Sequence, residues 1–214
     1  MTEGVFPAVT SRAFPGQTGI ETAEQAAGWR RVADSVHAAG GRIFMQVMNG
    51  GRLSHASLLE GEQPVAPSAL ASGTAVRDFE SRKECPVPRA LAREELRRII
   101  DEFRQAARNA VDAGMDGVEI HGANGYLLHQ FLSPSSNHRE DAYGGSPENR
   151  YRLVEEVVRA AAEEIGADRV ALRLSPQNNI QGIAETDAAD VLATYGGLLR
   201  ATADLGLAYV SFLN

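Results

Sequence analysis

The stretch Gly117-Val-Glu-Ile-His121-Gly-Ala-Asn124-Gly-Tyr126 decides how the rest of the chain is organised. A short, mainly apolar run stops abruptly in glycines and polar side chains, which is the pattern of a strand that ends in a βα loop. Ligands of parallel α/β sheets bind at the carboxyl ends of the strands. We therefore expect His121, Asn124 and Tyr126 to lie at a ligand site, although a histidine or asparagine after a strand often only caps a turn.

Strands and helices alternate on both sides of this stretch. The predicted strands are short apolar runs over 42–48, 117–121, 169–176 and 208–213, with the end of a further strand near Thr2-Glu3-Gly4. The predicted helices have apolar positions at helical spacing and lie between Thr22 and Gly40, over 93–113, between Ser146 and Gly166, and over 187–205. The run 42–48 hardly alternates, so we expect both of its faces to be covered. This order predicts an α/β fold with a parallel sheet, in a single domain over residues 1–214.

The composition limits the classes of protein to which the chain can belong. With 214 residues, of which 43% are hydrophobic and 23% charged, the chain can form one sizeable core. A formal net charge of -7 argues against a nucleic-acid partner. No apolar run is long enough to cross a membrane, and the N-terminus lacks the features of a signal peptide. The single Cys85, in a polar loop, excludes an internal disulfide, so we expect a cytoplasmic protein.

The residues after the strand carry a more specific signal. His121-Gly-Ala-Asn-Gly-Tyr-Leu-Leu128 is followed by Gln130-Phe-Leu-Ser-Pro134, Tyr143-Gly-Gly-Ser146 and Glu148-Asn-Arg150. This signature resembles the Old Yellow Enzyme family of FMN-dependent ene-reductases. It implies a (β/α)8 TIM barrel, a fold that typically runs to about 250 residues.

Against the family pattern, the chain covers only the middle of such a barrel. Residues 2–4 correspond to the end of strand two, and 42–48, 117–121, 170–174 and 208–213 correspond to strands three to six. Strand one and strands seven and eight are lacking, and in this family the last two hold the FMN phosphate. We therefore expect a partial barrel with open sheet edges, which a partner such as a second copy of the chain would cover.

The resemblance also implies the roles of the catalytic residues. His121 and Asn124 would donate hydrogen bonds to the carbonyl oxygen of an α,β-unsaturated carbonyl or nitro substrate. Hydride would pass from reduced FMN to the β-carbon, and Tyr126 would protonate the α-carbon. NADPH or NADH would reduce the flavin in the same pocket, because the chain has no Gly-x-Gly-x-x-Gly fingerprint for a second dinucleotide site.

Three further residues are implied to contact the flavin: Gly4, Gln46 and Arg173. The residues alone leave other roles open, since the Gln46 amide could bond a neighbouring loop backbone. Arg173 could pair with Glu119 from the adjacent strand, because a charge in a buried strand needs an anionic partner or ligand. No metal site is expected.

Several positions depart from the family pattern or compete with it. Asn49 stands where the family often has a histidine, and His129 stands where an aspartate is common; we expect a surface role for His129 and solvated positions for His37, His55 and His138. The alternative function is a non-catalytic remnant that keeps the pocket residues but cannot retain FMN. A barrel aldolase is disfavoured, because none of the four predicted strands contains a lysine that could form a Schiff base.

Overall fold

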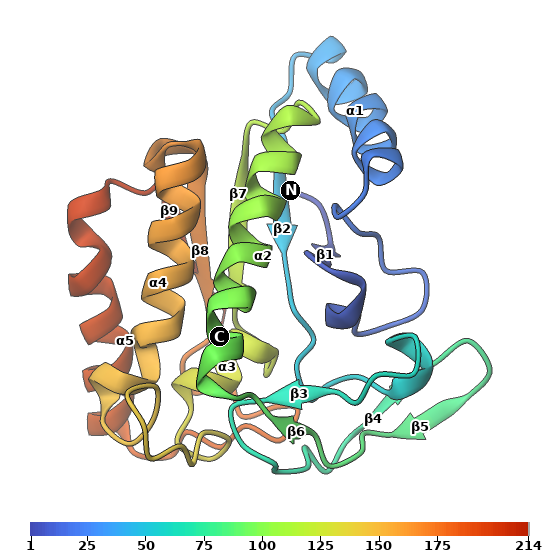
Figure 1. Cartoon of the computed structure of the whole chain (residues 1–214). Helices are drawn as coiled ribbons and strands as arrows, with labels where there is room; N and C mark the ends of the chain where they lie inside the picture. The colour runs from blue at the N-terminus through green and yellow to red at the C-terminus, as the bar shows by residue number, and fades with distance from the viewer. Residues whose placement is uncertain (214) are drawn as a thin grey trace.

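A twisted parallel sheet forms the centre of the computed structural model, which describes residues 1–213 (Figure 1). Its five strands lie in the order β1-β2-β7-β8-β9, and every neighbouring pair is parallel. The strands are β1 (Gly4–Val5), β2 (Phe44–Val47), β7 (Gly117–Gly122), β8 (Val170–Leu174) and β9 (Tyr209–Phe212). The four predicted strands, the predicted strand end near Gly4 and the α/β class are therefore confirmed.

The helices connect these strands in the predicted order. They are α1 (Ala23–Ala38), α2 (Arg93–Asp112), the short α3 (Leu127–Leu132), α4 (Pro147–Ile165) and α5 (Ala188–Thr202). α4 packs between α2 and α5, so these three helices cover one face of the sheet (Figure 1). Thr22 and Ser146, where two of the predicted helices begin, cap α1 and α4, and each accepts a hydrogen bond from the backbone N–H three residues on. Among the described residues, none of the helices is long and apolar enough to span a membrane.

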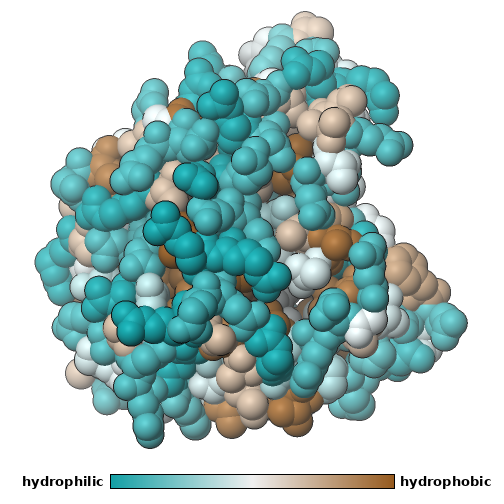
Figure 2. Space-filling view, in the orientation of Figure 1, coloured by the Kyte–Doolittle hydropathy of each residue, from teal (hydrophilic) through white to brown (hydrophobic). Residues whose placement is uncertain are grey.

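The outer surface of the helical layer is polar. Figure 2 shows mainly hydrophilic residues on this face, with isolated apolar patches. Part of this hydrophilic surface consists of ion pairs between residues one helical turn apart, such as Arg97 with Asp101 on α2 and Arg159 with Glu155 on α4. Such exposed pairs contribute little stability, so the buried apolar sides of the helices hold them on the sheet.

The strand register separates the two faces of the sheet. Val47, Ile120 and Leu172 point to the helices and are fully buried in the core. The opposite face carries polar side chains, with Gln46 beside Glu119 and His121 beside Arg173. The expectation that both faces of 42–48 would be covered was wrong, since burial in β2 alternates between half-buried and buried.

The sheet curves around its polar face. β2 and β9 are three strand spacings apart, or about 14 Å in a flat sheet. The rings of Phe44 on β2 and Tyr209 on β9 nevertheless lie 5.7 Å apart between centroids. Ser211 of β9 likewise reaches across β8 to Glu119 of β7, at 3.1 Å between Oγ and Oε2. The polar face is therefore the concave one.

β1 and β9 form the edges of this curved sheet. Within residues 1–213, no further strand pairs with either edge. Two side chains of β9 are among the more exposed large hydrophobic residues, Tyr209 at 37% and Phe212 at 52%. Apolar side chains beside open backbone groups make β9 a surface that another strand could cover.

The long connection 53–90 contains short elements that the sequence did not predict. β3 (Val65–Ala66) pairs in parallel with β6 (Arg89–Ala90), and β4 (Ala75–Arg77) pairs with β5 (Arg82–Glu84) in an antiparallel hairpin. Strands of two or three residues are too short to produce a recognisable alternation. Cys85 lies in the loop directly after β5, as expected, and its side chain is buried.

Candidate active site at the carboxyl end of the sheet

Glu119 lies at the centre of the concave polar face and is completely buried. Its carboxylate accepts hydrogen bonds from Gln46 Nε2 at 2.8 Å and Ser211 Oγ at 3.1 Å. Arg173 Nη1 lies 3.9 Å from Glu119 Oε1, so the ion pair considered from the sequence is present. The Gln46 amide bonds this side chain and not a loop backbone.

Arg173 and Gly4 nevertheless retain features of a ligand site. Arg173 Nε is buried and has no hydrogen-bond partner among the described residues, although the side chain as a whole is 24% exposed. Gly4 pairs with Gln46 in the strand register, and a Cβ added to it would lie 2.9 Å from the Sδ atom of Met48. A larger residue at position 4 would therefore displace the flexible end of the Met48 side chain. Gly4, Gln46 and Arg173 thus lie along one continuous surface.

His121 ends β7 on the same concave face. The side chain is 3% exposed, and within residues 1–213 neither ring nitrogen has a hydrogen-bond partner. Burial lowers the pKa of His121 to about 3, and the positive charge of Arg173 acts in the same direction. The imidazole is therefore neutral near neutral pH, with one donor and one acceptor open.

The turn after β7 places Asn124 and Tyr126 beside this histidine. Asn124 has φ +56° and its backbone N–H donates to Ser175 Oγ at 2.8 Å. Asn124 Oδ1 accepts from Asn178 Nδ2 at 3.2 Å, which leaves its own Nδ2 as the open end of the amide. The ring centroids of Tyr126 and His121 are 5.5 Å apart. The three predicted catalytic residues are therefore neighbours.

Tyr126 is half-buried above the concave face. Burial raises the pKa of its phenol, and a hydrogen bond with the Gln181 side chain acts in the opposite direction. The phenol therefore keeps its proton at neutral pH. A Cβ at Gly125 would lie 2.9 Å from Gln181 Cβ, and Gly125 has φ +78°, so this position requires glycine.

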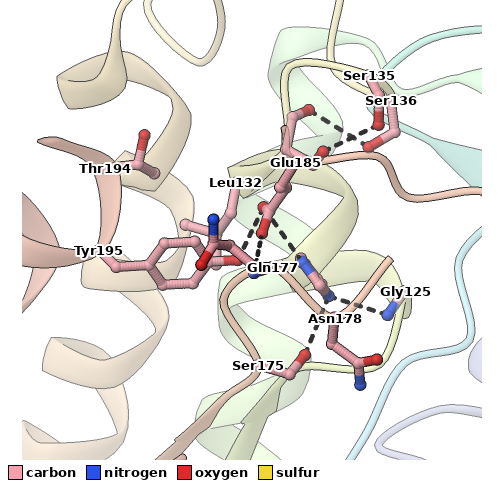
Figure 3. A network of polar contacts seen from close by, with 12 residues as sticks. Gly125, Leu132, Ser135, Ser136, Ser175, Gln177, Asn178, Glu185, Thr194 and Tyr195 are labelled. Carbon is pink, nitrogen blue, oxygen red and sulfur yellow. Dashed lines mark hydrogen bonds and ion pairs between the residues drawn. The ribbon is translucent and has the colours of Figure 1, made fainter. Parts of the chain in front are cut away.

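The surface role expected for His129 was wrong, because this side chain is completely buried in α3. His129 Nδ1 accepts the backbone N–H of Gly125 at 3.0 Å, and Nε2 lies 3.3 Å from Glu185 Oε1. The Glu185 carboxylate also accepts from the Tyr195 hydroxyl at 2.9 Å and the Gln177 backbone N–H at 2.8 Å (Figure 3). The sequence could have indicated this burial. His129 lies in the mainly apolar run Leu127-Leu-His-Gln-Phe-Leu132, and a histidine within a buried apolar helix is buried as well.

The protein matches known families over almost its whole length. The sequence model of the NADH:flavin oxidoreductase / NADH oxidase family covers residues 1–210. The chain belongs to this family. The resemblance to the Old Yellow Enzymes is thereby confirmed.

Individual members of the family show the same relationship. A probable flavin mononucleotide-dependent alkene reductase of Leishmania infantum is 47% identical over 181 residues, which is 81% of this chain and 49% of that protein. A putative 12-oxophytodienoate reductase-like protein 2A of Arabidopsis thaliana is 43% identical over 176 residues, covering 82% of this chain and 64% of that protein. The chain therefore spans about half to two thirds of the length of these relatives.

Solved structures of the family superpose closely on the fold. An old yellow enzyme homologue from Zymomonas mobilis gives a TM-score of 0.94 at 37% identity, covering 98% of this chain and 58% of that one. Morphinone reductase gives 0.90 at 41% identity, with 98% and 57% covered. The curved sheet and its helices are thus the family fold, over a little more than half of each solved chain.

Asn49, where the family often has a histidine, serves the loop that follows β2. It is buried, its Nδ2 donates to Ser11 Oγ at 2.8 Å, and its Oδ1 accepts the Gly51 N–H at 2.9 Å. The amide therefore stabilises the turn that follows β2. Of the histidines expected to be solvated, His37 and His138 are exposed and His55 is half-buried.

Proposed function

We propose that the protein is an FMN-dependent oxidoreductase that transfers a hydride to the C=C bond of α,β-unsaturated carbonyl compounds, with NADPH or NADH as electron donor. The single observation that carries the proposal is His121, buried to 3% exposure with both ring nitrogens unpartnered among the described residues, beside Tyr126. Buried polar atoms are nearly always hydrogen-bonded. A bound substrate oxygen would satisfy this requirement.

The concave face fits the ring system of a flavin. The buried, unpartnered Nε of Arg173 can donate to an electron-rich edge, and Gly4 has no side chain that would hinder a ligand on this face. Gln46 donates through Nε2 to Glu119, so its Oε1 stays open to accept from a ring N–H. When bound, FMN would supply the hydride for the reduction, and NADPH or NADH would reduce the flavin again.

His121 and Asn124 would bind the substrate oxygen. The neutral imidazole has one N–H to donate, and because Asn124 Oδ1 accepts from Asn178, the Asn124 Nδ2 is left as a second donor. Two donors directed at one oxygen stabilise the negative charge that develops there when a hydride adds to the conjugated bond. A nitro group offers oxygens of the same kind, so nitroalkenes fit the same pair.

Tyr126 would deliver the proton that completes the reduction. Burial raises the pKa of its phenol, so the group is protonated at neutral pH and can act as a general acid. Its ring lies 5.5 Å from the His121 ring, centroid to centroid, which supports a role beside the residue that would bind the substrate oxygen. We expect Tyr126→Phe to slow ene reduction by about 10²–10⁴.

The open edges of the sheet support a second candidate, a chain that keeps the pocket but does not retain FMN. In this reading residues 1–213 correspond only to strands two to six of the family barrel, so these residues alone would not hold the flavin phosphate. The supporting observation is the exposed edge strand β9, with Phe212 at 52% exposure. A second copy of the chain that covers this edge would restore closure.

Flavin retention tests the two candidates directly. The purified chain is mixed with excess FMN, desalted, and its visible absorbance is recorded together with its oligomeric state. Retained flavin bands support the oxidoreductase, whereas a colourless protein contradicts it. Arg173→Met should weaken FMN binding by at least about tenfold, as expected for loss of a charged hydrogen bond. Arg42→Met is the matched control, since Arg42 is 85% exposed just before β2.

A further inference from the structure

Two consecutive backbone N–H groups fix the turn that carries Asn124 and Tyr126. The Asn124 N–H donates to Ser175 Oγ at 2.8 Å and the Gly125 N–H donates to His129 Nδ1 at 3.0 Å. Both residues have positive φ, +56° at Asn124 and +78° at Gly125. A non-glycine residue rarely adopts this conformation. The turn therefore depends on the acceptors behind it.

The hydrogen bonds of His129 determine where its ring proton lies. A nitrogen that accepts a backbone N–H has a free lone pair, so Nδ1 is unprotonated. The proton must then be on Nε2, which faces the Glu185 carboxylate at 3.3 Å. A doubly protonated ring would lose the bond to Gly125, because both of its nitrogens would be donors.

The surroundings of His129 match this neutral tautomer. Tyr195 and the Gln177 backbone also donate to Glu185 (Figure 3), so the carboxylate is held in place to accept from Nε2. Burial acts to raise the pKa of Glu185, but these bonds and that of His129 leave it below its ordinary value. The other groups that face this cluster are the neutral ring of His121 and the guanidinium of Arg150.

We propose that His129, as the neutral tautomer with its proton on Nε2, is a positioning residue for the turn Asn124–Tyr126. Nδ1 holds the turn through Gly125, and Glu185 holds the ring through Nε2. Asn124 then keeps the backbone conformation that presents its amide, and Tyr126 stays over His121. The consequence for catalysis rests on the function proposed above, while the positioning itself does not.

Two substitutions separate the two sides of the ring. His129→Asn keeps an oxygen acceptor at the position of Nδ1, whereas His129→Gln keeps a donor near the position of Nε2. Amide hydrogen exchange of Gly125, measured by NMR and compared with the amides of β8 as a reference for global stability, is the readout. We expect exchange at Gly125 to become about five- to tenfold faster in His129→Gln and to change less than about twofold in His129→Asn. Equal effects in both variants would mean that the ring only fills space, and would overturn the proposal.

The unaltered protein provides a second test that does not depend on how the variants fold. The ¹⁵N chemical shifts of the His129 ring distinguish the two neutral tautomers from the imidazolium. A ring protonated on Nε2 alone at neutral pH supports the proposal, and a proton on Nδ1 contradicts it. Both measurements are made without FMN. A chain that retains no flavin but passes them would refute the proposed function and leave the positioning role standing.

Discussion

Two buried histidines, eight residues apart, are bonded in opposite ways. His121 at the end of β7 is 3% exposed, and neither ring nitrogen has a partner among the described residues. His129 in α3 is completely buried, and both of its ring nitrogens have partners. Since leaving a buried polar group unpaired costs free energy, we propose that the first histidine binds a ligand and that the second supports the structure. Burial alone would not have distinguished them.

The largest expected effect on stability comes from removing the hydrogen-bond partner of His129, the histidine whose ring nitrogens are both bonded. Glu185→Ala removes the acceptor shared by the buried side chains of His129 and Tyr195 and by the part-buried backbone N–H of Gln177. Three donors left unpaired should lower the free energy of unfolding by about 3–5 kcal/mol. Urea denaturation followed by circular dichroism measures the loss.

Glu185→Gln is the matched control for this substitution. It keeps the shape and one acceptor oxygen, so we expect a loss of only about 1–2 kcal/mol. If Glu185→Ala cost less than this control, the cluster behind the turn would not be a stabilising network, and the contrast between the two histidines would fail.

The next largest effect comes from His121, the histidine without hydrogen-bond partners, and it is a dependence of stability on pH. His121 is neutral in the fold because burial lowers its pKa from 6.5 to about 3, whereas the unfolded chain binds a proton below about pH 6.5. The unfolded state then binds more protons, so stability falls as the pH drops below 6.5. At about pH 5 the contribution of this residue should be lower by about 2 kcal/mol.

His121→Phe should remove this pH dependence and cost little or nothing at about pH 7.5, because it replaces two unpaired polar atoms with an apolar ring. Urea unfolding at the two pH values measures the difference. His138→Gln is the control, since His138 is exposed and should leave the slope unchanged. An unaltered slope in His121→Phe would show that its ring is already bonded in solution.

The fold was largely predictable because its signals are local. The strand 117–121 ends where the apolar run meets glycine, and Thr22 and Ser146 cap helices whose apolar positions recur at helical spacing. The hairpin in 53–90 was not predictable, since β4 and β5 span only three residues each. Strands this short are too brief to show a recognisable alternation of apolar and polar residues, even though they pair locally.

The site was predictable only in part. Three polar residues after one strand, His121, Asn124 and Tyr126, indicated the loop of the candidate site. In the structure these residues are neighbours. The support behind them comes from distant residues: Glu185 is 56 positions from His129 and bonds it only once β8 and α5 are in place. Sequence spacing contains no trace of such a contact, and a polar residue is easily taken for a surface residue.

The smallest expected effect tests whether an unpartnered buried atom always indicates a ligand. Glu102 on α2 has an Oε2 atom without a partner in the described part of the chain, and its side chain is 16% exposed. Burial raises its pKa to about 7, while Arg98 acts in the opposite direction and Glu21 in the same one. The folded state therefore holds a proton that the unfolded state releases, and stability falls as the pH rises from 4.5 through 7.

Glu102→Gln should raise the free energy of unfolding by about 1–2 kcal/mol at about pH 8 and leave it unchanged at about pH 4. The value is set below the full effect of the pKa shift because Arg98 lies 3.6 Å from the carboxylate and the site is partly solvated. Glu163→Gln, at an exposed position on α4, is the control and should change little at either pH. A gain at about pH 8 would mark Glu102 as a strained structural charge, so that only unpartnered atoms on the concave face indicate a ligand. A loss would mean that its charge is bound by a group outside the described contacts, and Glu102 would then belong with His121.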